Sequence, residues 1–371
     1  MTDRRDHDRG APPVDANAGS AVRPLSRRRL AAAVAGCAGV AAAVCALSPL
    51  VGVDGAGGGR HLALLDLRAI VDGLAGAPTV DAQLFALARL PRVLAGAVVG
   101  AGLAVAGCAL QALLRNPLAE PYTVGVSSGA SLAALLAIRL GLDATWLGSS
   151  AIGLAALAGA AITIYAVWRL AQTDGDLPPA ALLLAGLVIA IVCSAASMLV
   201  QYTATFSETY RFVRWMMGGL EWIRYGPLWR AAVPTAAGIA VLLWLARDLN
   251  ALSAGGEAAA SVGVHPTRAR TIGFFAASLV VGAAISVAGP IGFVGLVVPH
   301  VLRGAVGPDH RVLLPASAFA GAAFVVACDT VARIVLAPAQ LPVGIVTALI
   351  GGAFFAYVFR REKTRARLWG G

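Results

Sequence analysis

The chain has 371 residues, of which 58% are apolar and only 13% are charged, and its mean hydropathy is +0.78. This composition excludes an ordinary soluble protein and predicts several membrane-spanning helices, because one crossing of a bilayer core about 30 Å thick takes roughly 20 apolar residues. The formal net charge of +10 does not indicate nucleic-acid binding, since no basic stripe interleaved with aromatic residues occurs along the chain.

Apolar runs separated by short polar breaks predict ten helices, and these runs do not alternate as the strands of a β-barrel do. The predicted helices begin near Leu30, Pro91, Tyr122, Ala144, Pro179, Pro227, Thr271, Ile291, Leu313 and Pro342. Those near Tyr122 and Ile291 are short and rich in glycine, which is typical of broken or half-depth helices in transporters. The predicted fold is therefore an all-α polytopic membrane domain over residues 30–360, flanked by a disordered basic tail at 1–29 and a second basic tail at 361–371.

The distribution of basic residues predicts that both tails lie in the cytoplasm. With both ends of the chain on one side of ten helices, about two thirds of the 29 Lys and Arg residues fall on that side, which is the bias that membrane insertion produces. Contact of this face with anionic lipid accounts for the positive net charge. The long charged lead before Leu30 favours a retained first helix over a cleaved signal peptide.

The first motif in chain order is a pair of arginines at the start of the second helix. Arg89 and Arg92 flank Pro91, and their spacing places both on one side of the helix start. Two interpretations stay open: an interfacial pair whose stems pack on apolar surface, and a docking site for acidic groups of an external protein. Further along the same helix, Gly96 and Gly100 form a GxxxG face that predicts close packing against another helix.

Two polar interruptions follow on the predicted cytoplasmic side. The second helix ends at the sequence RNPLAEP, where Asn116 and two prolines stop it, and the Gly/Ser segment that comes next is tolerated at membrane depth only beside protein or a water-filled path. Residues 246–270 contain two short helical stretches broken by glycines, and their apolar pattern predicts docking of a soluble partner at the membrane edge. The contacts expected there are Leu252, Ala259 and Val262.

Several kinds of chemistry are not expected. The only lysine, Lys363, lies in a terminal basic stretch, so the chain has no GxxxxGK[ST] phosphate loop and is not expected to hydrolyse ATP itself. The five histidines lack ligand spacing, which argues against a protein-built metal centre, and no catalytic set gathers on one predicted helix face. Asp329 and Arg333, spaced i,i+4, are the clearest charges within the bilayer and form either a local ion pair or a functional pair.

Several motifs together resemble the FecCD family, the permease subunits of ATP-binding-cassette (ABC) importers for ferric siderophores, haem and vitamin B12. In order from about Arg89 to Arg360, they are RLPR, GCALQALLRNPLAEP, GVSSGA, LNALSAGGEAAASVGV, GPIGFVGLVVPHVLR, DHRVLLP, DTVARIV and LPVGIVTALIGGAFF. The residues before Leu30 lie outside the resemblance.

The resemblance implies a homodimer of ten-helix subunits in a bacterial inner membrane, with the vitamin B12 permease-like fold of type II importers and inverted half-repeats. It implies two ATP-binding subunits beneath, which bind ATP and Mg²⁺, and a periplasmic substrate-binding protein above; no cofactor is expected in this chain itself. By the same resemblance, Arg89, Arg92 and Arg333 dock the binding protein, and Asn116 and Leu118 form the cytoplasmic gate.

The resemblance also assigns residues 249–264 to coupling with the ATPases. The coupling residues expected are Leu249, Leu252, Gly256, Glu257, Val262 and Gly263. The chain departs from the vitamin B12 permease at a second gate position, where Pro179 and Ala180 replace small hydroxyl residues, so that role is not carried over.

The predicted function is the passage of a bulky iron complex from periplasm to cytoplasm. Because the predicted lining is apolar, haem is the first cargo expected, a ferric siderophore is a close second, and cobalamin follows. Two rival functions stay open. An ion-coupled secondary carrier is disfavoured by the scarcity of buried carboxylates, and a sensor or structural protein leaves the segment at 249–264 unexplained.

Overall fold

The computed structural model describes residues 27–54, 61–76, 79–142, 145–146, 149–173, 175–221 and 223–369. Of the predicted tail at 1–29, residues 1–26 lie outside these ranges, and residues 27–29 already belong to the first helix.

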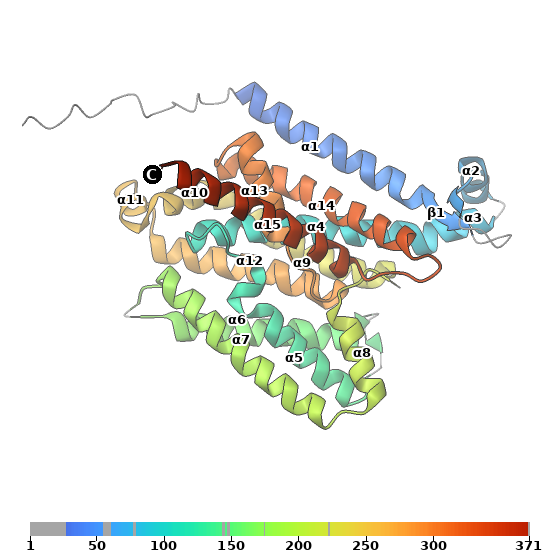
Figure 1. The fold of residues 1–371 in the computed structure, drawn as a ribbon, viewed down its shortest axis with the longest axis horizontal. Helices are drawn as coiled ribbons and strands as arrows, with labels where there is room; N and C mark the ends of the chain where they lie inside the picture. The colour runs from blue at the N-terminus through green and yellow to red at the C-terminus, as the bar shows by residue number, and fades with distance from the viewer. Residues whose placement is uncertain are drawn as a thin grey trace, which may run out of the picture.

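The predicted all-α membrane architecture is confirmed within the described residues (Figure 1). The ten apolar helices are α1 (Arg27–Leu47), α4 (Leu90–Leu113), α5 (Val126–Arg139), α6 (Ala151–Ala171), α7 (Pro179–Tyr202), α9 (Tyr225–Trp244), α12 (Pro266–Ala288), α13 (Val294–Val306), α14 (His310–Val335) and α15 (Val343–Trp369). Among the described residues, eight helices are long and apolar enough to cross a bilayer, whereas α5 and α13 are shorter apolar helices.

Short elements connect these helices. The helical ones are η1 (Ser48–Leu50), α2 (Leu67–Ala75), α3 (Val80–Gln83), η2 (Leu84–Arg89), η3 (Pro121–Val124), α8 (Phe206–Met216), α10 (Ala246–Ala254) and α11 (Gly256–Ser261). The extended ones form two antiparallel pairs, β1 (Val51–Asp54) with β2 (His61–Leu64) and β3 (Thr145–Trp146) with β4 (Ser149–Ser150). The β3–β4 pair explains why the helix predicted from Ala144 begins only at Ala151.

The two helices predicted to be short each begin after a left-handed residue. Gly125 precedes α5 with a φ of 80°, and Phe293 precedes α13 with a φ of 68°. A residue in this conformation interrupts a right-handed helix, so irregular backbone comes before both helices. The two irregular segments contact each other, because the Phe293 N–H donates to the Glu120 carboxylate. This bond satisfies a backbone group that would otherwise be costly inside a membrane.

Packing contacts fix the relative direction of α4 and α12. A side chain at Gly102 would meet Val280, and one at Gly273 would meet Leu113, so the two helices run antiparallel. Each is followed by an irregular segment and a short helix, α5 or α13. This arrangement is the inverted half-repeat expected from the sequence.

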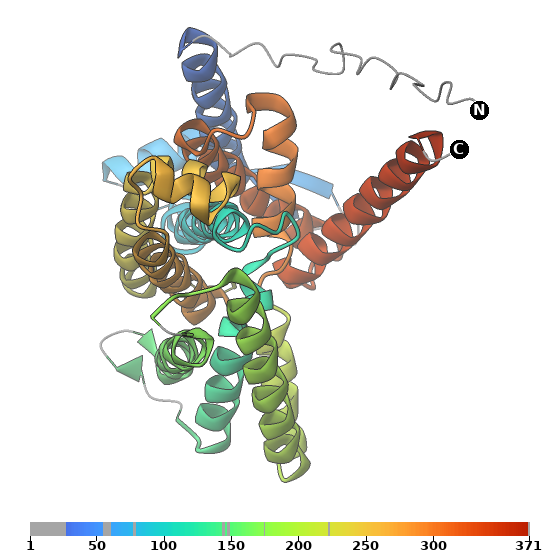
Figure 2. The same ribbon diagram turned by 90° about the vertical axis from the view of Figure 1, so that its left-hand side faces the viewer.

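The helix bundle has two ends that differ in composition. The α10 end, on the left in Figure 1, carries α10, α11, the start of α1 and the end of α15, whereas the α2 end carries α2, α3 and β1. Figure 2 views the bundle from the α10 end and shows α4 near the centre of one group of helices. The most apolar part of α4 is 78% buried, against 6% for α1 and 17% for α7, so the outer helices present broad apolar faces.

Glycines allow α4 to approach its neighbours closely. A Cβ added at Gly100 would lie 2.2 Å from the Gly321 carbonyl oxygen, and one at Gly107 would lie 2.1 Å from that of Gly295. Gly96 faces Leu220 and residues of α14 in the same stripe. The predicted packing role of the GxxxG face is therefore confirmed.

The end of the last helix differs from the expected domain boundary. α15 continues without a break to Trp369, so residues 361–369 of the predicted tail extend the last helix, whereas the candidate membrane span ends at Arg361.

Candidate functional site

A buried ion pair at the α2 end joins the start of α4 to the last turns of α14. The Arg92 guanidinium donates from Nε to both carboxylate oxygens of Asp329, at 3.0 and 2.8 Å, and from Nη2 to Oδ1 at 2.8 Å. Arg92 is 8% exposed and Asp329 is 2% exposed. Because the bonds are charge-assisted and shielded from water, this contact holds the two helices in a defined position.

The other two predicted docking arginines also have partners within the chain. Arg333 Nε lies 3.4 Å from Asp329 Oδ2, which confirms the ion-pair interpretation of that i,i+4 spacing. Its Nη2 donates to the Ser48 carbonyl oxygen at 3.0 Å. Arg89 Nη1 donates to the Pro49 carbonyl oxygen at 3.0 Å. Two of the three arginines therefore share one carboxylate, and the third is tied to the connection after α1.

Docking of a partner by these three arginines stays a prediction, and the geometry restricts how it would occur. Arg92 is too buried to reach a partner unless Asp329 is displaced, whereas Arg89 and Arg333 are partly exposed. Sequence-based reasoning missed the pairing of Arg92 with Asp329 because 237 residues separate them and no local spacing links them.

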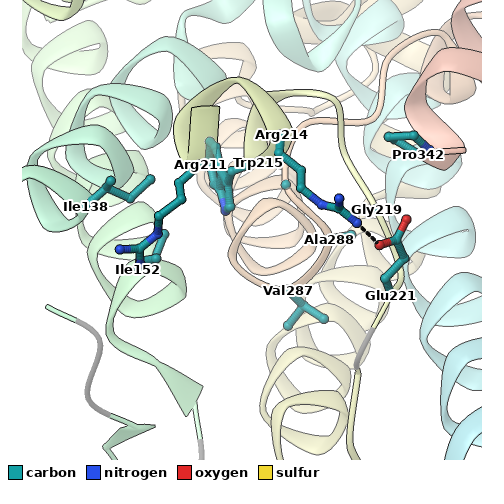
Figure 3. A pocket seen from close by; sticks show the side chains of 11 residues that line it. Ile138, Ile152, Arg211, Arg214, Trp215, Gly219, Glu221, Val287, Ala288 and Pro342 are labelled. Carbon is teal, nitrogen blue, oxygen red and sulfur yellow. Dashed lines mark hydrogen bonds and ion pairs between the residues drawn. The ribbon is translucent and has the colours of Figure 1, made fainter. Parts of the chain in front are cut away.

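A pocket of about 300 Å³ opens beside α8 (Figure 3). Its lining includes Arg214, which donates to Glu221 at 2.5 Å, and the indole of Trp215.

α8 was not among the predicted helices, although a capping box formed by Thr205 and Glu208 marks its start. The T-x-x-E spacing is the sequence signal that would have located this helix.

A second cavity, of about 260 Å³, lies between α5, α7 and α8 and is lined by neutral polar groups. Its polar residues are Ser127, Ser128, Ser131, Ser194, Ser197, Gln201 and Tyr122, and its apolar ones are Met198, Phe212 and Met216. We refer to it as the serine cavity. No charged residue is among those that line it, so it offers hydrogen bonds without a counter-ion. The apolar lining expected from the sequence does not describe this cavity, because its serines converge only when α5 and α7 pack together.

The predicted gate residues form a tight turn after α4 at the α10 end. The Leu118 N–H donates to Asn116 Oδ1 at 2.9 Å, and the Asn116 N–H donates to the Gln111 carbonyl oxygen at 3.1 Å. Leu118 is 58% exposed, so the turn displays an apolar side chain at the surface. Its role as a gate stays a prediction. Pro179 and Ala180, at the second gate position, simply begin α7.

The predicted coupling segment consists of α10 and α11, which meet at Gly255. Leu249 and Leu252 are each 1% exposed and Ala259 is fully buried, so they present no surface to a partner in this structure, and the contact expected of Leu252 and Ala259 stays a prediction. These side chains instead fix the two short helices to the bundle, because the apolar face of an amphipathic helix is buried first against its own chain.

The surface that the segment leaves free is formed by other predicted coupling residues. Val262 is 70% exposed, Glu257 and Gly263 are also exposed, and Gly256 is partly exposed. Coupling through these residues stays a prediction.

A polar clamp connects α10 to the start of α14. Asn250 Nδ2 donates to Asp309 Oδ1 at 2.8 Å, and the His310 N–H donates to Asn250 Oδ1 at 2.9 Å. Asp309 caps α14 by accepting from the Arg311 N–H at 3.0 Å, and the Arg311 guanidinium holds the pKa of Asp309 well below its usual range. Sequence-based reasoning missed Asn250, whose partner is 59 residues away.

The described residues contain no group of three or more His, Cys, Asp or Glu side chains placed to hold a metal ion. We therefore assign no residue of the described ranges to a metal.

Comparison with known proteins identifies the family. The FecCD transport family matches residues 62–361. The chain is 44% identical to the cobalamin import system permease protein BtuC of Halobacterium salinarum over 78% of this chain and 77% of that protein. It is 41% identical to the vitamin B12 import system permease protein BtuC of Escherichia coli O9:H4 over 74% of this chain and 83% of that protein. A solved structure described as an inward-facing conformation of a metal-chelate type ABC transporter superposes with a TM-score of 0.76 at 29% identity, covering 89% of this chain and 99% of that one. The chain belongs to the FecCD transport family.

Proposed function

We propose that this permease is the membrane subunit of an ABC importer and that it carries a corrinoid of the cobalamin type across the membrane. The observation that carries the proposal is the sequence identity of 44% and 41% to proteins named as cobalamin and vitamin B12 permeases, over about three quarters of the chain. This cargo replaces haem, which the expected apolar lining favoured.

The serine cavity supports the choice of cargo on chemical grounds. A corrin ring carries amide side chains at its rim, and hydroxyl and amide groups such as those of Ser131, Ser197 and Gln201 can both donate to and accept from amides. Haem carries ionised propionates, and a buried carboxylate without a cationic partner is costly. At about 260 Å³ the cavity holds only one edge of a corrinoid, so a second copy of the chain would supply the opposite wall.

The proposed orientation follows from the distribution of basic residues. The α10 end faces the cytoplasm and two ATP-binding subunits, and the α2 end faces the periplasmic substrate-binding protein. Glu257 and Val262 are the exposed residues available to an ATPase, and Arg89 and Arg333 are those available to acidic groups of the binding protein.

ATP drives transport because the ATP-binding subunits bind it with different affinities in two conformations of the importer. Movement of α10 is passed to α14 by the Asn250 clamp, and α14 is joined to α4 by the Arg92–Asp329 pair at its far end. Because α4 leads into the turn at Asn116, a shift of α14 would change the position of the gate.

Uptake in proteoliposomes tests the proposal. The permease, its ATPase and its binding protein are reconstituted and supplied with labelled cyanocobalamin, haem or a ferric siderophore. We expect ATP-dependent uptake of cyanocobalamin and of neither other compound. The double variant Ser131→Val, Ser197→Val should take up cyanocobalamin roughly tenfold more slowly, because each lost hydrogen bond leaves an amide of the corrinoid unpaired. Uptake of haem or a ferric chelate instead would overturn the cargo. Uptake without the ATPase, abolished by collapsing a proton gradient, would overturn the importer function.

A further inference from the structure

A deep apolar groove lies on the surface of the bundle between α1, α13 and α14. It has a volume of about 590 Å³. α1 contributes Ala33, Gly36, Cys37 and Val40, and the opposite walls include Leu302 and Phe324. Every residue that lines it is apolar, and neither the transport path nor the coupling segment uses it.

The groove opens into the hydrocarbon layer and not into water. α1 and α14 are both long enough to cross a bilayer, and only 6% of the apolar window of α1 is buried within the chain. A void of this kind forfeits dispersion contacts with its walls unless something fills it. Among the components that surround a membrane helix, an acyl chain matches its apolar lining.

One end of the groove lies next to the α10 end, and its lining continues along α1 to Val44, in the last turn of that helix. Ala33 is in the second turn of α1, and Leu302 is near the end of α13, which are both at that end. Helical periodicity places position 29 on the face of α1 that carries Ala33 and Gly36, whereas position 28 is rotated about 100° around the helix from position 29. The first turn of α1 has the sequence RRRL and contains no acidic residue.

We infer that the groove binds one phospholipid with an anionic headgroup, whose acyl chain lies against α1, α13 and α14 and whose phosphate lies near the arginine run at the start of α1. An apolar groove with basic residues at its interfacial end is the arrangement that retains anionic lipids between membrane helices. The inference rests on the membrane location of the chain and not on the identity of its cargo.

Two glycines of α1 provide a matched test. A Cβ added at either Gly36 or Gly39 would meet no atom within 4 Å, so the first carbon of a side chain fits at both positions without displacing a neighbour. Gly36 lines the groove and Gly39 does not. In Gly36→Leu the new side chain enters the groove, whereas in Gly39→Leu it starts from a position outside the lining, about 60° around the helix from Gly36.

Native mass spectrometry measures the lipid directly. The full chain is reconstituted with equal amounts of phosphatidylglycerol and phosphatidylethanolamine and then extracted. We expect one retained phosphatidylglycerol per subunit in the wild type and in Gly39→Leu, and roughly tenfold lower occupancy in Gly36→Leu. Equal occupancy in the two variants, or none in the wild type, would overturn the inference.

The headgroup is tested separately with Arg29→Gln against Arg28→Gln. We expect Arg29→Gln to lose the preference for phosphatidylglycerol over phosphatidylethanolamine while total lipid is kept, because the acyl site is intact, and Arg28→Gln to keep the preference. Equal behaviour of the two variants would overturn the anionic specificity. A photoreactive phosphatidylglycerol used on the unsubstituted chain checks the site without any variant. Adducts on the peptides of Cys37 and Phe324 support it, and their absence contradicts it.

Discussion

At the scale of single residues, Arg92, Asp329 and Arg333 at the α2 end form one buried network of charges. Asp329 neutralises Arg92 through two-point bonding and also faces Arg333. Breaking a buried pair by removing one member leaves an uncompensated charge, which costs about 3 to 5 kcal/mol. An exposed pair contributes about 0 to 1 kcal/mol because water screens it.

We therefore expect Asp329→Asn to lower the free energy of unfolding by about 3 kcal/mol, since it leaves two arginines without their counter-ion. Denaturant titration in detergent measures the change. Arg139→Gln is the control, because Arg139 pairs with Glu208 at 3.2 Å near the surface, where water screens the pair and its loss changes the free energy of unfolding little. If both variants lose the same small amount, the buried network does not stabilise the fold.

At the scale of elements, the close approach of α4 to α13 depends on the absence of side chains. A methyl group at Gly107 would lie 2.1 Å from the Gly295 carbonyl oxygen, which no rotamer change can relieve because the obstacle is backbone. Overpacking of this kind costs about 1 to 3 kcal/mol.

Gly107→Ala is expected to destabilise the protein by about 2 kcal/mol or more through this overpacking. Gly352→Ala is its matched control, because a side chain there meets nothing within 4 Å and alanine favours the helical conformation by about 0.5 to 1 kcal/mol. Thermal unfolding should shift in opposite directions for the two variants. A shift in the same direction would mean that the α4–α13 contact tolerates separation.

The clamp between α10 and α14 is also an element-scale feature, because it joins two helices that are not consecutive in the chain. We expect Asn250→Ala to lower transport per ATP hydrolysed by roughly tenfold while ATP hydrolysis continues, since the three hydrogen bonds that join Asn250 to Asp309 and His310 are removed. Ser253→Ala is the control, because Ser253 donates only within its own helix, to Leu249. Parallel loss of both activities would indicate a folding defect instead of uncoupling.

At the scale of the whole molecule, the beginning of α1 and the end of α15 lie at the α10 end (Figures 1 and 2). The excess of basic residues at that end predicts a cytoplasmic location. Epitope tags at both termini should therefore be protected from protease in spheroplasts and cleaved in inside-out vesicles. Cleavage of either tag in intact spheroplasts would contradict this orientation.

The order of the helices could be predicted wherever neighbouring residues in the sequence carry the signal for a helix or for its end. Runs of about 20 apolar residues marked the long spans, and glycine-rich sequence marked α5 and α13 as short. The helix α8 has a local capping signal at Thr205 that the hydropathy pattern obscured. The contact surface of the coupling segment could not be predicted, because the sequence shows that α10 is amphipathic but not that its apolar face packs on its own bundle.

By itself, the sequence determined that this is a polytopic helical membrane protein, the approximate positions of its ten apolar helices and which family it resembles, because hydropathy, glycine breaks and motifs are properties of neighbouring residues. Only the tertiary structure decided that Arg92 is bound by Asp329, that serines of α5 and α7 line one cavity, and that α1 leaves an apolar groove. Each of these depends on helices that are far apart in the chain, and their partners are selected by packing and desolvation, which no local pattern encodes.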